Sequence, residues 1–242
     1  MHPPCIDTRQ AGQVQDLPLQ IGFCSDAKRK TAVNDVLARI GELKLVPVVK
    51  IEKAKDARSL GEALSAGGLP LAEITFRTDA AEEAIRILNR ELPDLLIGAG
   101  TVLTVDNVKR AVDAGAQFMV APGFNPKVVD HCLANGILVM PGVNSPTDVE
   151  MGLDRGLDVL KFFPAEASGG LKMLKALSGP YGGVKFMPTG GITTKNLLEY
   201  LAFDRVLACG GTWMVEAAFI SAGRFDEITK LTREAVELIA NR

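Results

Sequence analysis

Short apolar runs alternate along most of this chain with stretches in which apolar residues recur at helical spacing. About 23 residues separate one run from the next, which is enough for a strand, a helix and two short loops. The runs begin near Leu45, Leu71, Leu95, Phe118, Ile137, Val159, Val184 and Val206. Eight such strand–helix units predict an α/β fold, the (β/α)8 TIM barrel, with functional groups at the C-terminal ends of the strands.

A doubly wound open sheet shows the same alternation and is the main alternative to the barrel. Such a sheet usually has fewer strands and carries a glycine-rich fingerprint after its first strand. The first run here ends at Ile51 without glycines, which favours the barrel.

The two ends of the chain lie outside this alternation. Residues 1–27 are aperiodic and predict a poorly ordered N-terminal extension, whereas residues 28–242 predict a single barrel domain. An extra N-terminal helix is expected from Lys28 to Gly41, because apolar residues recur there at Val33, Val36, Leu37 and Ile40. The tail from Arg224 to Arg242 predicts a closing helix that turns inward Phe225, Ile228, Leu231, Ala235 and Leu238.

Polar residues occupy the predicted inner face of the second strand. Because side chains alternate along a strand, Leu71, Glu73, Thr75 and Arg77 share the face that points into the barrel or to its top. An acid and a base on an inward face are energetically expensive, which favours a functional role. A buried ion pair of purely structural role is the alternative.

The sixth predicted strand carries a lysine among apolar residues. Lys161 shares a face with Val159 and Phe163, and lysine is rarely fully buried. Burial disfavours the charged ammonium and so favours a free amine. A free amine attacks a carbonyl and forms a Schiff base, which serves as an electron sink. An edge-strand lysine facing solvent, or one paired with a carboxylate, is the alternative.

Glycine pairs end the seventh and eighth predicted strands. Gly190-Gly191 and Gly210-Gly211, the latter followed by Thr212, stand where barrel enzymes often bind phosphate. Glycine lets the backbone approach a phosphate closely. A single pair would be weak evidence because turns also use it, but two pairs at these positions favour a phosphorylated ligand.

Composition narrows the choice of function. Of the 242 residues, 47% are hydrophobic and 23% are charged, and the formal net charge is −2. These values are typical of a globular domain and disfavour disorder and nucleic-acid binding. With only His2 and His131 and four widely separated cysteines, no metal-ligand cluster is expected. No leader or membrane-spanning run is recognisable, so a cytoplasmic location without a membrane partner is expected.

Seven segments together resemble a known family. In chain order they are LAEITFRT, GAGTVL, APGFNP, MPGVNSPTDVE, KFFPAEASGG, MPTGGI and GGTWM. They are similar to the 2-keto-3-deoxy-6-phosphogluconate (KDPG) aldolases, from about Leu45 to the C-terminus. KFFPAE with PTGGI is specific to this family, whereas GAGTV and APG alone are not.

The resemblance implies a class I aldolase, a lyase that reversibly cleaves KDPG to pyruvate and glyceraldehyde 3-phosphate in the Entner–Doudoroff pathway. It implies that Lys161 forms the Schiff base, that Glu73 is the general acid and base, and that Arg77 binds the pyruvyl carboxylate. It implies further substrate contacts at Thr101, Pro122, Phe163 and Thr189. It implies a phosphate site at Gly190, Gly191, Gly210, Gly211 and Thr212, where the family often has Ser in place of Thr212.

The resemblance also implies a homotrimer that needs no metal or other cofactor. The nearest alternative keeps the chemistry but acts on 2-keto-4-hydroxyglutarate (KHG) or on the galactonate epimer of KDPG. Another phosphate-binding barrel, such as a phosphosugar isomerase or a thiamin-phosphate-type synthase, would not need the lysine. A catalytically silent binding barrel is allowed by the fold, but the set of Lys161, Glu73 and Arg77 favours the aldolase.

Overall fold

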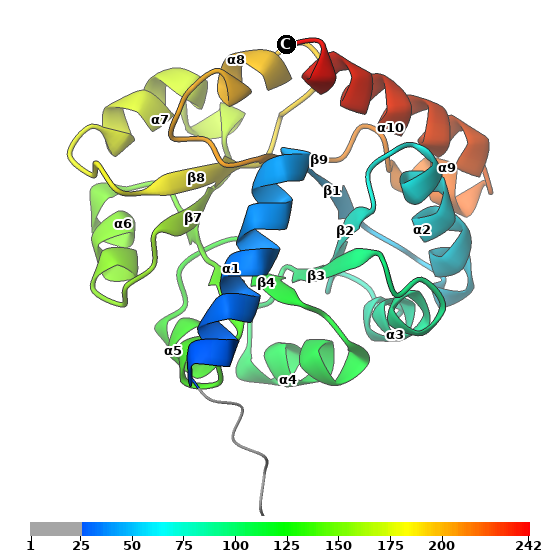
Figure 1. Ribbon diagram of the computed structural model, residues 1–242, viewed down its shortest axis with the longest axis horizontal. Helices are drawn as coiled ribbons and strands as arrows, with labels where there is room; N and C mark the ends of the chain where they lie inside the picture. The colour runs from blue at the N-terminus through cyan, green and yellow to red at the C-terminus, as the bar shows by residue number, and fades with distance from the viewer. Residues whose placement is uncertain (1–25) are drawn as a thin grey trace, which may run out of the picture.

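The computed structural model describes residues 26–242 and shows a parallel β-sheet that curls into a barrel, with helices around it (Figure 1). Its strands are β1 (Leu45–Val49), β2 (Leu71–Thr75), β3 (Leu96–Gly100), β4 (Phe118–Val120), β5 (Leu138–Met140), β6 (Gly142–Val143), β7 (Val159–Phe162), β8 (Lys185–Pro188) and β9 (Cys209–Gly211). Its α-helices are α1 (Asp26–Leu43), α2 (Ala57–Ala66), α3 (Ala81–Glu91), α4 (Val105–Ala114), α5 (Pro126–Ala134), α6 (Pro146–Leu153), α7 (Gly170–Ser178), α8 (Leu197–Leu201), α9 (Ala217–Ser221) and α10 (Phe225–Ala240). Two short 3-10 helices are η1 (Ala54–Asp56) and η2 (Glu166–Ser168).

Pro141 divides the fifth predicted strand into β5 and β6. β5 pairs with β4, whereas β6 pairs with β7. Proline has no backbone N–H to donate to a ladder, although the Pro141 carbonyl accepts the N–H of Lys161 at 2.9 Å. Counted as one bent strand, β5 and β6 give the eight strands that the pattern predicts.

The sheet closes on itself, which confirms the predicted barrel. β9 pairs with β1 along three residue pairs. On its other side, single parallel bridges join Phe186 to Val206 and Thr189 to Gly210, so β9 also meets β8. A closed ring leaves no free sheet edge. A side chain in the middle of an inner face therefore cannot reach solvent around an unpaired edge strand.

Side-chain alternation sorts the apolar residues into two clusters. Leu71 and Val159, the first residues of β2 and β7, belong to the cluster inside the barrel. Ala72, Ile74 and Leu160 belong to the cluster between the sheet and the surrounding helices. The predicted faces of both strands are therefore confirmed, and the same alternation points Glu73 and Lys161 inward.

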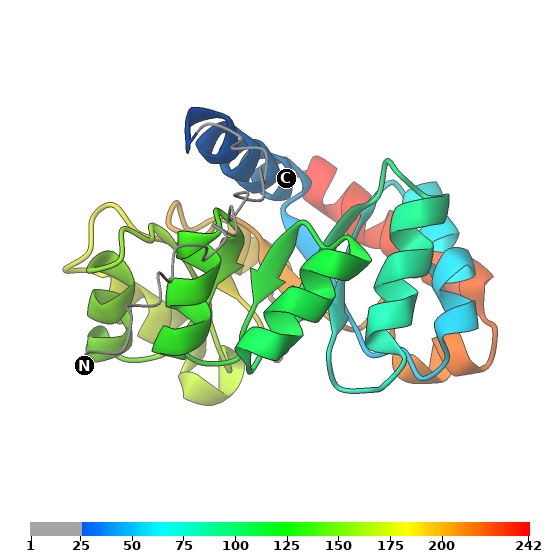
Figure 2. The same ribbon diagram turned by 90° about the horizontal axis from the view of Figure 1, so that it is seen from below.

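Helix α1 closes the N-terminal end of the barrel. Ile40 is fully buried in the inner cluster, and Val33, Val36 and Leu37 pack against it. Figure 2 shows α1 on one side of the ring of other helices. The helix begins at Asp26, two residues before the predicted start. The rest of the predicted extension, residues 1–25, lies outside the described residues.

Helix α10 covers the outside of the barrel, where it contacts α2. Ile228 and Ala235 are fully buried. Phe225, Leu231 and Leu238 are partly buried against the same cluster, so the predicted inward face is confirmed. This burial fastens the end of the chain to the first strand–helix unit.

Candidate active site

A cavity of about 270 Å³ opens at the C-terminal ends of the strands, close to the lower end of the range for small-molecule sites. It is lined by residues from β1, β2, β7 and β9 and from the loops that follow β2, β3, β4, β7, β8 and β9. The lining residues are Val48, Glu73, Thr75, Arg77, Thr101, Pro122, Lys161, Phe163, Thr189, Gly190, Gly191, Ile192, Gly210, Gly211 and Thr212.

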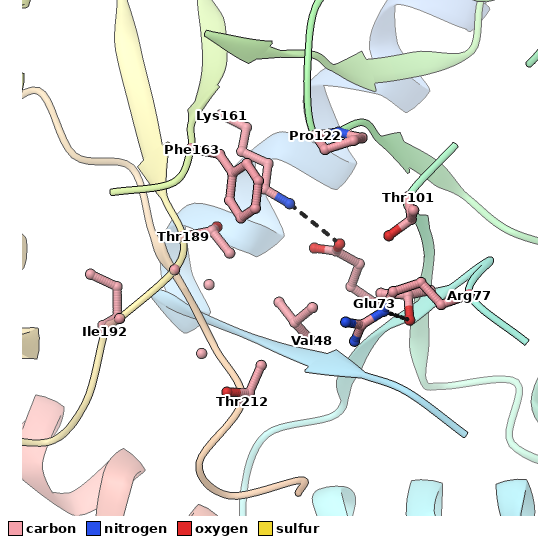
Figure 3. A pocket seen from close by; sticks show the side chains of 15 residues that line it. Val48, Glu73, Arg77, Thr101, Pro122, Lys161, Phe163, Thr189, Ile192 and Thr212 are labelled. Carbon is pink, nitrogen blue, oxygen red and sulfur yellow. Dashed lines mark hydrogen bonds and ion pairs between the residues drawn. The ribbon is translucent and has the colours of Figure 1, made fainter. Parts of the chain in front are cut away.

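Lys161 and Glu73 face each other inside the barrel (Figure 3). Lys161 Nζ lies 3.7 Å from Glu73 Oε1, and the two residues are 5% and 0% exposed. This separation makes an ion pair but is too long for a hydrogen bond. Neither Glu73 oxygen has a hydrogen-bond partner among the described residues. A buried carboxylate without donors is costly, and both of its oxygens are available to accept a proton or a ligand hydrogen bond.

Apolar groups shield this pair. The Phe163 ring lies with its centroid 5.0 Å from Lys161 Nζ, within reach of a cation–π contact. Pro122 lines the cavity from the loop after β4, across from Phe163 in Figure 3. A cis peptide bond joins Phe163 to Pro164 in the turn after β7. The amine is thus held in a partly apolar wall at the bottom of an open cavity.

Glycine at position 100 gives the Glu73 side chain its space. A Cβ built on Gly100 would lie 2.1 Å from Glu73 Oε1 and 2.8 Å from its Cδ and Cγ. The next residue, Thr101, has a left-handed backbone with φ of 55°. That conformation is unfavourable for a β-branched residue and costs of order 1–3 kcal/mol. Such strain is typical of functional sites. With this backbone conformation, Thr101 lines the same cavity as Glu73.

Arg77 lies just beyond the end of β2 and is exposed at the cavity. Its Nε donates a hydrogen bond to Thr75 Oγ1 at 3.1 Å. Within residues 26–242 its guanidinium forms no ion pair with a carboxylate, unlike those of Arg110 and Arg155. An arginine that keeps its full charge at a cavity is suited to bind an anionic group in a bidentate manner.

Two glycine-rich segments, the loop after β8 and the end of β9, form the opposite side of the cavity. Gly190 and Gly191 have left-handed backbones, with φ of 100° and 82°. A Cβ on Gly210 would lie 2.3 Å from Thr189 Oγ1, so these two segments touch where the barrel closes. The exposed Thr212 stands at the mouth. Such a backbone suits an anion that is bound by main-chain N–H groups.

The structure brings all twelve sequence-predicted site residues to this one cavity. Three further lining residues were not predicted: Val48, Thr75 and Ile192. The signal for Thr75 was present, because alternation already placed it on the inner face with Glu73. Within residues 26–242 no cluster of three or more His, Cys, Asp or Glu side chains is arranged to hold a metal ion. No helix in that range has both the length and the apolarity to cross a membrane.

Comparisons with known proteins agree on one family. The family model described as "KDPG and KHG aldolase" matches residues 36–231. A 2-dehydro-3-deoxy-phosphogluconate aldolase of Treponema pallidum is 48% identical over 204 residues, which cover 84% of this chain and 97% of that protein. A KHG/KDPG aldolase of Escherichia coli is 44% identical over 193 residues, covering 80% and 91%.

A solved structure shows the same architecture. The KDPG aldolase of Legionella pneumophila superposes with a TM-score of 0.80 at 41% identity, covering 85% of this chain and 98% of that one. That structure holds pyruvate captured as a covalent carbinolamine intermediate. A carbinolamine forms when an amine adds to a ketone, which is the chemistry that a buried lysine amine in the cavity would supply.

Proposed function

Since this chain belongs to the KDPG and KHG aldolase family and is a 2-dehydro-3-deoxy-phosphogluconate aldolase, we propose that Lys161 is its Schiff-base lysine and Glu73 its proton-transfer group. The observation that carries this assignment is the buried pair itself. Lys161 Nζ lies 3.7 Å from Glu73 Oε1 inside a closed barrel, at the bottom of the cavity. At this distance the pair is slightly longer than a hydrogen bond, and a small approach of the two side chains when substrate binds allows the proton transfer.

The first half of the reaction joins the substrate to the enzyme. Glu73 takes a proton from the Lys161 ammonium, and the free amine attacks the C2 ketone of KDPG. The resulting carbinolamine loses water, with Glu73 returning a proton to the leaving hydroxyl. The product is a protonated imine between Lys161 and C2, which supplies the electron sink, so the proposed mechanism uses no metal or other cofactor.

The second half breaks the carbon chain. Glu73 removes the proton of the C4 hydroxyl, the C3–C4 bond breaks, and its electron pair moves into the imine to give an enamine. Glyceraldehyde 3-phosphate leaves. Protonation of the enamine at C3 and hydrolysis of the imine release pyruvate and restore Lys161. A single positioned carboxyl group that alternates between acid and base serves both halves.

The two ends of the cavity orient the substrate: Arg77 provides a cation at one end, and backbone amides of the glycine segments line the other. Arg77 binds the C1 carboxylate through two parallel N–H donors, which sets orientation as well as charge. Thr101, Pro122, Phe163 and Thr189 surround the pyruvyl part. The 6-phosphate is held at the other end, by the two segments that contain Gly190, Gly191, Gly210, Gly211 and Thr212.

Borohydride trapping tests the assignment of Lys161. Incubation with pyruvate and borohydride should leave a reduced pyruvyl adduct on the peptide that contains Lys161. Lys161→Ala should lose both the adduct and KDPG cleavage. Lys185→Ala is the matched control, because Lys185 is exposed at the start of the neighbouring strand β8; it should keep both. Failure of the folded protein to form an adduct would contradict the Schiff-base mechanism.

The substrate range within the family is open to a direct comparison. The E. coli relative is named for both KHG and KDPG, and KHG carries a carboxylate where KDPG carries the phosphorylated end. We propose KDPG as the main substrate because two glycine-rich segments face that end of the cavity. A higher kcat/KM for KHG, or for the C4 epimer of KDPG, would overturn this preference.

Oligomeric state and location complete the proposal. We propose a homotrimer, as family resemblance implies; a sedimentation mass of one chain would refute it.

We place the protein in the cytoplasm because Cys132 and Cys209 are buried, unbridged thiols, which suits a reducing compartment. Recovery of activity in a secreted or membrane fraction of the source cells would contradict this placement.

A further inference from the structure

We propose that Thr75 is a positioning residue for Arg77: its hydroxyl holds the guanidinium by Nε and leaves both terminal nitrogens free for the substrate carboxylate. The proposal rests on the proposed function, in which Arg77 binds the pyruvyl carboxylate. Thr75 is 2% exposed and is the last residue of β2, between Glu73 and Arg77 on the same inner face.

The hydrogen-bond directions at Thr75 follow from its partners. Thr75 Oγ1 lies 2.7 Å from the carbonyl oxygen of Val49 and 3.1 Å from Arg77 Nε. A carbonyl only accepts and a guanidinium nitrogen only donates. The hydroxyl therefore gives its one proton to Val49 on β1 and accepts the proton of Arg77 Nε, as the dashed line from Arg77 in Figure 3 marks. Because the Thr75 hydroxyl donates one hydrogen bond and accepts the other, rotation of the side chain would break at least one of them.

A hydroxyl anchors an arginine without neutralising it. Elsewhere in the described chain, Arg110 Nε meets Glu82 at 2.7 Å and Arg155 Nε meets Asp130 at 2.6 Å. Those carboxylates fix their arginines but also cancel their charge. Thr75 fixes the same atom of Arg77 with a neutral acceptor, so the full positive charge remains for an anionic ligand.

The anchor also selects which edge of the guanidinium is presented. Arginine binds a carboxylate either through its two terminal nitrogens or through Nε and one terminal nitrogen. With Nε committed to Thr75, only the pair of terminal nitrogens remains for a bidentate contact. The substrate carboxylate is therefore received end-on, with one orientation relative to Lys161, which is the positioning that carbonyl attack requires.

Thr78 provides a matched control on the same segment. Its hydroxyl donates to the Ile51 carbonyl at 2.6 Å, so it fastens the β2 end to the β1 end just as Thr75 does. Thr78 makes no hydrogen bond with Arg77 in the described structure. Replacing Thr78 by Val removes a comparable bond between the two segments but leaves the Arg77 anchor in place.

The experiment measures how pyruvate concentration governs borohydride trapping on Lys161, in the full chain. We expect Thr75→Val to raise the half-saturating pyruvate concentration about tenfold, as loss of a hydrogen bond to a charged group implies. Thr75→Ser should restore it, and Thr78→Val should leave it near that of the unsubstituted chain. In an Arg77→Ala background, Thr75→Val should add no further increase, because the group that it positions is gone.

Each result is decisive. Equal increases in Thr75→Val and Thr78→Val would overturn the proposal in favour of a general role in fastening β2 to β1. A further increase in the Arg77→Ala background would overturn it in favour of direct contact between Thr75 and pyruvate. If Thr75→Val fails to fold, Thr75→Ala takes its place with the same expectations. Absence of any adduct in the unsubstituted chain would overturn the proposed function, and this proposal with it.

Discussion

Substitution of Gly100 by Ala tests whether the position of the Glu73 carboxylate controls the reaction. The added Cβ would lie 2.1 Å from Glu73 Oε1, whereas ordinary contact begins at 3.4 Å. Gly100 lies in β3 and does not have a left-handed backbone, so alanine can adopt its conformation. The change therefore acts through space, and the three atoms nearest to the added Cβ all belong to Glu73.

The geometry sets the size of the effect. The carboxylate must move by about 1.3 Å, the difference between the two distances. Because Glu73 is fully buried, this movement changes its separation from Lys161. A displacement of about 1 Å of a catalytic group costs on the order of 100-fold in rate. We expect kcat for KDPG cleavage to fall by about that factor, while pyruvate binding through Arg77 changes little.

A coupled assay for pyruvate release measures kcat, and thermal unfolding measures stability. Gly98→Ala is the matched control on the same strand: its Cβ would meet the Phe118 ring at 2.2 Å, and the three atoms nearest to that Cβ all belong to Phe118 rather than to Glu73. Overpacking of that kind costs typically about 1–3 kcal/mol of stability, with less effect on kcat. An unchanged kcat in folded Gly100→Ala would refute the reasoning.

Three other predictions concern separate parts of the molecule. Gly191→Ala puts a side chain at φ of 82° and 2.6 Å from Glu166 Cβ, so KM for KDPG should rise while pyruvate trapping is unchanged; an unchanged KM would argue against a phosphate site there. Ser145→Ala removes the capping box of α6 and should lower the free energy of unfolding by about 1 kcal/mol in urea titration, whereas an unchanged midpoint would contradict that role. Burial raises the pKa of the Cys132 thiol from 9.0 to about 12, so the folded chain keeps a proton that the unfolded chain loses above pH 9. Stability should therefore fall as the pH rises from 9 toward 12, and Cys132→Ala should remove part of that fall; an unchanged pH profile would contradict it.

The fold was predictable because eight apolar runs recur at even spacing and alternate with stretches of helical periodicity. The apolar runs near Leu71 and Val159 correspond to β2 and β7, which begin at those two residues. The prediction missed the division at Pro141, since a run of apolar letters does not reveal where one ladder ends and another begins. It also began the last strand at Val206, whereas β9 begins at Cys209; the first residues of that run form only a single bridge to Phe186.

Twelve of the fifteen residues that line the cavity were predicted from the sequence, but the contacts between them were not. Alternation within β2 placed Glu73, Thr75 and Arg77 on one face. It could not show that the Thr75 hydroxyl bridges Arg77 to β1, because that bridge needs the register between β1 and β2. Nor could it show why position 100 is glycine, since the reason is a side chain that arrives from the neighbouring strand β2.

Two charged groups, Glu73 on the inner face of β2 and Arg77 just beyond its end, are held in opposite ways, and the difference matches the roles proposed for them. Arg77 is anchored by a neutral hydroxyl that fixes its orientation and preserves its charge. Glu73 has no hydrogen-bond donor among the described residues, where its one ion-pair partner within 4 Å is Lys161. A group that binds one anion throughout the reaction gains from a fixed orientation. A group that accepts and returns protons gains from the lack of a permanent donor, because such a donor would stabilise the carboxylate and weaken it as a base. The segment from Glu73 to Arg77 thus carries a fixed group, proposed to bind the carboxylate, and an unfixed group, proposed to transfer protons, four residues apart.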